Sequence, residues 1–145
     1  KEFKPLNLLV VWVGNFIGCF MSGVIVLFTF PPATMEKVVA GATKIMTMRL
    51  SSPWYTLIVL GIMCGILMYM AVQGSARAEM SYKPFVAMLP VAVFIFCGYA
   101  HCVADMFYYS TAQMYTQAAL PVLFVTIGNV IGCNIPPLLK REGSH

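Results

Sequence analysis

His101 and Asp105 are the only charged or histidine side chains in the long apolar stretch from Pro84 to Leu139. They are four residues apart, so an unbroken helix would place both on one face. An ionisable pair inside a membrane span indicates a functional site. The carboxylate favours a charged imidazolium and burial opposes it, so we expect His101 to exchange a proton near neutral pH. Gly98 predicts a break or kink just ahead of the histidine, which would expose backbone groups to a cavity.

The composition defines the class of protein in which this pair is found. The chain has 145 residues with a net charge of +4, and 60% of them are apolar against only 10% charged. A soluble domain is roughly 45–50% apolar and about 25% charged. So short a chain has too little interior for this much apolar surface, which must therefore face lipid or partner subunits. Soluble domains, disordered tails and nucleic-acid modules are excluded, and we predict an all-α polytopic membrane protein.

A helix needs about 20 residues to cross the hydrocarbon core of a bilayer, and this length decides which apolar runs are predicted to be membrane spans. The mixed segment 33–52 predicts a short interfacial helix rather than a span. Residues 1–141 are expected to form one transmembrane domain, and 142–145 to be a tag or linker remnant. The predicted spans cover residues 6–30, 53–73, 84–109 and 118–139.

Charged loops and cysteines give the expected orientation and exclude a metal cluster. With four spans, six basic residues fall on one side and three on the other, which places both chain ends in the cytoplasm. We therefore expect a multi-pass protein of the cell (inner or plasma) membrane with a cytoplasmic C-terminus. The five cysteines lie in apolar runs without metal-ligand spacing, so no metal and no cofactor are expected.

Two spans contain nearly the same motif. Residues 14–19 and 128–133 match at five of six positions, and both include a Gly-xxx-Gly spacing that suits close helix approach in lipid. Because the two spans run in opposite directions, the motif indicates an inverted repeat, and two further spans are then expected ahead of the first. The predicted helix-packing residues are Gly14, Asn15, Gly18, Gly128, Asn129 and Gly132.

These segments resemble the formate/nitrite transporter family. The resemblance rests on Gly98–Met106 (GYAHCVADM) and Val125–Gly132 (VTIGNVIG), supported by Leu60–Cys64 (LGIMC) with Ala71 and by Gly14-Asn15. It covers nearly the whole chain, as the last four of the family's six spans. It implies an aquaporin-like helical bundle with a broken pore-lining helix, assembled in the lipid bilayer as a homopentamer. It also implies passage of small monovalent anions (formate, nitrite or hydrosulfide), with protons as possible partners in transport.

The same resemblance implies roles for particular residues. His101 matches the family's pore histidine, while Phe94 and Met68 match apolar residues of the two slits on either side of it. Either Lys44 or Arg49 matches the family's basic residue ahead of the second span. An anion attracted there would lose water at the slits, where a neutral acid crosses at lower cost than an ion, and His101 would exchange the proton.

The chain departs from the family pattern at three positions. Ala100 replaces the usual glutamate before the histidine, Asp105 replaces an asparagine, and Gly65 replaces an asparagine after the cysteine of the second span. The first two differences together predict that one carboxylate stays near the imidazole.

Three other functions are weighed against the anion channel. A water or glycerol channel would need Asn-Pro-Ala boxes, and the sequence has none. A haem-anchoring subunit needs two axial ligands per haem, usually histidines. Apart from the tag-like His145, the only histidine of this sequence is His101. A non-conducting structural subunit would use the His–Asp pair to pin two helices. No motif of an enzyme is present.

Overall fold

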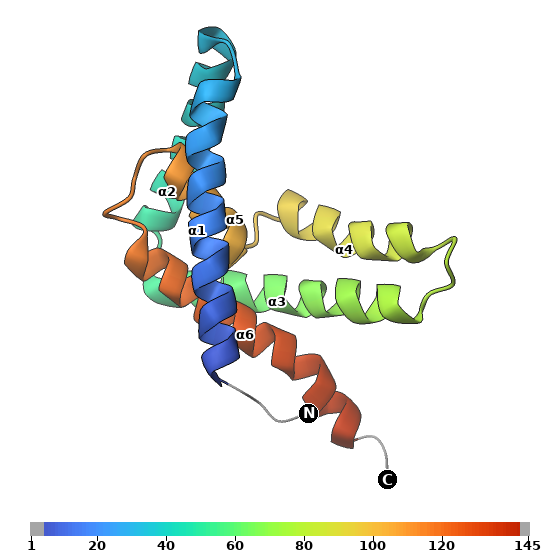
Figure 1. The fold of residues 1–145 in the computed structure, drawn as a ribbon. Coiled ribbons are helices and arrows are strands. Elements are labelled where there is room, and N and C mark those ends of the chain that lie inside the picture. Colours follow the sequence, from blue (N-terminus) through green and yellow to red (C-terminus); the bar gives the residue numbers. More distant parts are fainter. Residues whose placement is uncertain (1–4, 143–145) are drawn as a thin grey trace. The chain divides into compact units, whose positions relative to one another are not determined.

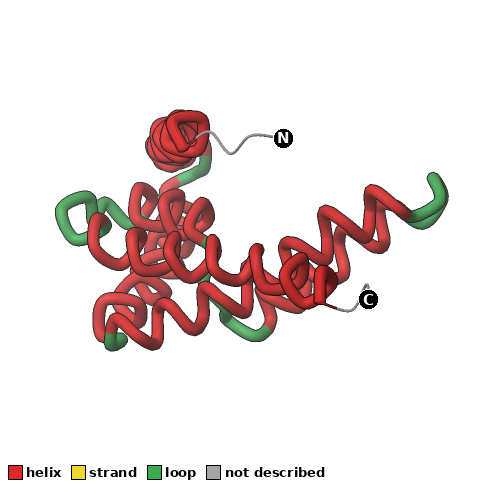
Figure 2. The backbone as a smooth tube through the Cα atoms, turned by 90° about the horizontal axis from the view of Figure 1, so that it is seen from below, coloured by secondary structure: helices red, strands yellow, loops and turns green. Residues whose placement is uncertain are grey.

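The computed structural model describes residues 5–142, and within this range the chain is built from helices joined by short loops (Figures 1 and 2). The predicted tag or linker remnant falls, from residue 143 onward, outside the described residues. The six helices of the described range are α1 (Pro5–Thr29), α2 (Pro32–Ser51), α3 (Trp54–Arg77), α4 (Lys83–Phe96), α5 (Cys102–Thr111) and α6 (Ala119–Glu142).

Three of the described helices, not the four predicted, are long and apolar enough to cross a membrane. They cover Leu6–Thr29, Trp54–Arg77 and Ala119–Leu139. The predicted span 84–109 contains two helices, α4 and α5, rather than one continuous helix. A break was expected at Gly98, and the chain leaves the helical conformation there, with φ +68°. The all-helical membrane fold with a broken helix is confirmed.

Prolines set several of the helix boundaries. α1 ends at Thr29, before Pro31, and α2 begins at Pro32, the position where a missing N–H costs least. The Pro31 carbonyl accepts hydrogen bonds from the N–H groups of Thr34 and Met35, both 3.0 Å, so it closes the first turn of α2. The segment expected to form a short interfacial helix is thus a helix of 20 residues.

The chain forms two compact units. The first consists of residues up to Ser51 together with Val103–Ala119, and it contains α1, α2 and most of α5. α1 and α5 meet where Gly23 faces Ser110, whose hydroxyl donates a 2.8 Å hydrogen bond to the Phe20 carbonyl. Because the Ser110 side chain occupies the space that a Cβ at position 23 would need, glycine is required there.

The second unit consists of Ser52–Cys102 and the residues from Leu120 onward. α3 and α4 lie side by side as a helical hairpin (Figure 1). α6 packs on α3 through four glycines, two from each helix, which we call the glycine seam. A Cβ added to any of them would meet backbone atoms of the opposite helix, so only glycine allows this approach. The glycine seam consists of Gly61, Gly65, Gly128 and Gly132.

Large apolar side chains cover the outside of the helices. Phe28 is 85% exposed and Phe96 is 89% exposed. A monomeric soluble protein does not present apolar residues on this scale, so these surfaces suit lipid or neighbouring subunits. The interior of the second unit is small by comparison, with Leu57, Ala100 and Val125 at its centre.

Candidate functional site

The helix break ahead of His101 has a defined geometry. At the end of α4 the Tyr99 N–H donates to the Phe94 carbonyl at 3.0 Å, and the Gly98 N–H donates to the Ile95 carbonyl at 3.1 Å. These are the paired bonds of a Schellman motif, which requires a left-handed residue just after the helix. Gly98 supplies that conformation. The chain therefore turns out of the helix at a fixed place, and His101 follows in a non-helical segment.

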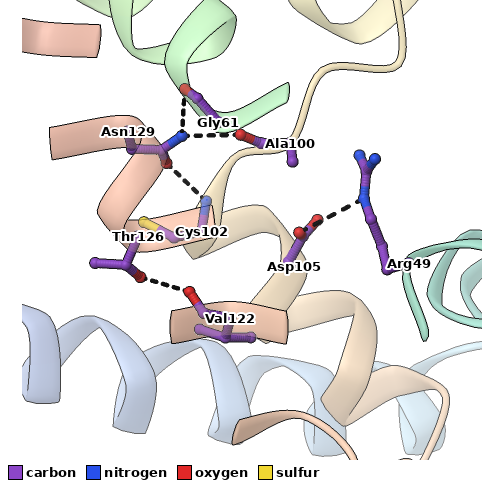
Figure 3. A network of polar contacts seen from close by, with 8 residues as sticks. All are labelled: Arg49, Gly61, Ala100, Cys102, Asp105, Val122, Thr126 and Asn129. Atoms are coloured by element: carbon purple, nitrogen blue, oxygen red, sulfur yellow. Dashed lines mark hydrogen bonds and ion pairs between the residues drawn. The ribbon is translucent and has the colours of Figure 1, made fainter. Parts of the chain in front are cut away.

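Asn129 of α6 holds both sides of this segment (Figure 3). Its side-chain Nδ2 donates to the carbonyls of Ala100 and Gly61, each at 2.9 Å, and its Oδ1 accepts the Cys102 N–H at 3.0 Å. Cys102 is the first residue of α5, whose opening N–H groups have no partner within the helix. One amide side chain therefore caps α5 and bonds on either side of His101 while also contacting α3.

A further backbone contact fixes the residue before the histidine. The Ala100 N–H donates to the Leu60 carbonyl of α3 at 3.4 Å. The Ala100 side chain is fully buried and packs in the apolar cluster of Leu57 and Val125. His101 is thus preceded by a residue whose N–H, carbonyl and side chain are all held by α3 and α6.

The imidazole of His101 lies against the ring of Phe94. The two ring centroids are 5.7 Å apart and the planes differ by 18°, a stacked arrangement. Phe94 belongs to the last turn of α4, and the Schellman turn brings the chain back so that the histidine reaches this ring. Among the sequence-selected residues, these two are brought together.

The condition under which His101 and Asp105 would share one helix face, an unbroken helix, is not met. The helix is broken, and His101 lies before the first residue of α5. Asp105 instead forms an ion pair with Arg49 of α2, with 3.7 Å between Nε and Oδ2 (Figure 3). The side chains are 12% exposed for Arg49 and 3% exposed for Asp105. The expectation missed this pair because it relied on helical spacing alone.

The other sequence-selected residues have different surroundings. Lys44 is exposed on α2, and Met68 is half-buried on α3. Gly128 and Gly132 are part of the glycine seam. Among the described residues, nothing lies within 4 Å of a Cβ built on Gly14 or Gly18. Asn15 between them is exposed.

Sequence reasoning missed two partners of the site, Gly61 and Cys102, because both take part through backbone atoms. A signal was nevertheless present. An amide in the middle of an apolar span needs hydrogen-bond partners, and so few polar side chains surround it in the sequence that backbone groups are the natural candidates. Gly98 then shows where unpaired backbone groups would be found.

An all-helical chain of apolar helices, with one helix broken at a glycine ahead of a histidine, is typical of a membrane transport protein. The family model of the formate/nitrite transporters matches residues 5–137. The chain therefore belongs to the formate/nitrite transporter family. It is also 26% identical over 154 residues to the formate channel FocA of Haemophilus influenzae, covering 87% of this chain and 54% of that protein. The chain thus spans about half the length of this curated relative.

Two departures from the family pattern have a local explanation. A glutamate at position 100 would have to place its carboxylate where Ala100 packs against Leu57 and Val125. An asparagine at position 65 would begin with a Cβ against the carbonyl oxygen of Asn129 and 2.9 Å from the Cys133 N atom. The small residues at both positions therefore match the close packing of α3, α6 and the segment before His101.

Proposed function

We propose that the protein conducts small monovalent anions, of the class of formate, nitrite and hydrosulfide, across the cell membrane, and that His101 exchanges a proton with the passing species. The proposal is supported by membership of the formate/nitrite transporter family and by the printed name of the relative, a formate channel. In the proposed assembly the subunits form a homopentamer in the bilayer, and the C-terminus lies in the cytoplasm.

The observation that carries the role of His101 is its position at the helix break. A histidine inside an unbroken apolar helix would present only its side chain, whereas a turn out of the helix also opens backbone groups toward a pathway. The segment is held by Asn129 on both sides, so the imidazole has a defined place beside Phe94. A fixed imidazole is suited to giving and taking a proton.

The proposed mechanism follows from the cost of moving an ion through an apolar constriction. At slits formed by Phe94 and Met68 an anion loses its water, which is far more costly than passage of the neutral acid. A proton donated by His101 to formate or nitrite gives formic or nitrous acid, which crosses at lower cost. The acid releases this proton to water on the far side, and the neutral imidazole takes up another proton from water on the entry side before the next anion arrives.

Flux into proteoliposomes containing the full chain tests this proposal. Gradients of formate, nitrite and hydrosulfide are compared at about pH 5 and about pH 7.5, on either side of the usual histidine pKa. We expect selective flux that changes with pH, and His101→Asn should remove that pH dependence. Cys97→Ala, at an exposed position in the same turn, serves as the control and should behave as wild type. Absence of flux for all three anions from assembled protein would refute the proposal.

A further inference from the structure

The ion pair between α2 and α5 has an unusual chemical setting. Arg49 and Asp105 are both largely withdrawn from solvent, yet their closest charged atoms are 3.7 Å apart, longer than a charge-assisted hydrogen bond. Asp105 Oδ2 has no hydrogen-bond donor among the described residues. Attraction between the charges, rather than a direct hydrogen bond, therefore accounts for the pairing.

The contact engages the guanidinium through its Nε atom alone. Asp105 is approached by Nε, while the two terminal nitrogens of Arg49 point away from it (Figure 3). The strongest arginine–carboxylate pairs are bidentate, with two parallel N–H···O bonds. Asp105 thus compensates the charge of Arg49 without engaging it through a bidentate contact.

A second polar group lies on the same face of α5. Tyr109 follows Asp105 by one helical turn and is 2% exposed, and its hydroxyl has no hydrogen-bond partner among the described residues. Buried polar atoms in native proteins are nearly always paired with protein, water or a ligand. An unpaired carboxylate oxygen and an unpaired hydroxyl on one face are suited to a small polar molecule that both donates and accepts hydrogen bonds.

We infer that Arg49, Asp105 and Tyr109 form a binding site for a small acid, in which Asp105 is the counter-ion of Arg49. Asp105 thereby sets the charge of the species that this site binds. With both residues present the Arg49–Asp105 pair has no net charge, so it favours a small acid in its protonated form over the anion. A protonated carboxylic acid can donate to Asp105 and accept from Tyr109, which the anion cannot do. The inference rests on the proposed transport of weak acids, and it makes Asp105 a specificity-determining residue.

The charge of the site predicts the effect of each substitution. Asp105→Asn removes one negative charge from the site, so formate anion should bind at least tenfold more tightly, as expected when a like charge within a few ångströms is removed at an effective dielectric constant of about 20. Arg49→Gln leaves an uncompensated carboxylate, and formate binding should weaken by a similar factor. The double variant is neutral again and should resemble wild type.

Binding of sodium formate to the purified full chain in detergent measures the relative affinities of wild type and the variants, and it does not require a transport assay. The readout is the formate concentration that gives half of the maximal thermal stabilisation at neutral pH. Glu36→Gln, an exposed acidic position on the same helix as Arg49, is the matched control and should leave the value unchanged. We expect Asp105→Asn to bind most tightly, Arg49→Gln most weakly, and wild type and the double variant to lie between them.

The order of the variants separates this role from a structural one. If the pair only pins α2 to α5, both single variants will weaken binding together, and that result overturns the inference. Equal binding by all four proteins also overturns it. If Asp105→Asn does not fold, recovery of formate binding on going from Arg49→Gln to the double variant still supports the inference, and no recovery refutes it. A wild-type protein that binds formate in this order but conducts no anion would refute the proposed function alone.

Discussion

Replacing Asn129 by alanine should release the segment that carries His101. The amide makes three hydrogen bonds, to the Cys102 N–H and to the carbonyls of Ala100 and Gly61. Ala100 is fully buried, so water cannot replace the amide at its carbonyl. The Gly61 carbonyl lies within α3 and retains its helical environment, so its loss is the smallest of the three.

The expected cost follows from these partners. A buried polar group left without a partner costs about 1–3 kcal/mol, and losing one of several bonds costs about 1 kcal/mol. For the Ala100 carbonyl and the Cys102 N–H, which lose their partner, and the Gly61 carbonyl, which loses one of its bonds, Asn129→Ala should lower the free energy of unfolding by about 3–7 kcal/mol. That is a large part of the stability of a typical protein.

Thermal denaturation in a mild detergent measures the loss, and amide hydrogen exchange locates it. We expect a lowered denaturation midpoint and faster exchange at the start of α5, where Cys102 loses its acceptor. Asn134→Ala is the matched control, because Asn134 is an exposed asparagine of the same helix whose side chain donates to the Val130 carbonyl one turn before it. It should change stability by no more than about 0.5 kcal/mol.

A leucine at position 129 keeps the volume of the side chain and removes its hydrogen bonds. If Asn129→Leu is as destabilising as Asn129→Ala, hydrogen bonding rather than volume accounts for the effect. The reasoning is refuted if Asn129→Ala has the same denaturation midpoint as Asn134→Ala and the same rate of amide hydrogen exchange at the start of α5. In that case the segment before His101 would be held by its other contacts.

Further substitutions test the packing of the two units. Gly132→Ala should destabilise by about 1–3 kcal/mol because its Cβ meets the backbone of α3 and neither partner can yield; Gly41→Ala, where nothing lies within 4 Å, should be neutral or slightly stabilising in the same denaturation assay. Gly98→Ala should cost about 1 kcal/mol or more because the turn needs φ +68°, and a wild-type midpoint would contradict the assigned turn. Ser110→Ala removes the 2.8 Å hydrogen bond to the Phe20 carbonyl, and double-mutant analysis against Gly23→Ala should show coupling between the two positions.

The features that depend on local chemistry could be predicted from the sequence. Apolar runs gave the long helices, Pro31 and Pro32 marked a boundary between two of them, and Gly98 marked the break, because each of these residues acts on its own backbone. Membership of the family was also visible, in the segments around His101 and Asn129.

The features that depend on long-range contacts could not be predicted in the same way. Helical spacing suggested that Asp105 faces His101, whereas the break places them in different segments and Asp105 pairs with Arg49 of another helix. Nothing in the sequence around Arg49 marks it as the partner rather than Lys44. The backbone partners of Asn129 were equally invisible, since any residue can supply a carbonyl or an N–H group.

The glycine seam between α3 and α6 has an entropic consequence. Glycine has no rotamers, so closing this contact immobilises no side chain at the four positions that touch. The backbone freedom that glycine would otherwise lose is removed earlier, when each helix forms in the apolar phase. Packing of α6 on α3 can then be a late step of assembly with a low cost in conformational entropy. It is driven by dispersion between the backbones rather than by release of water.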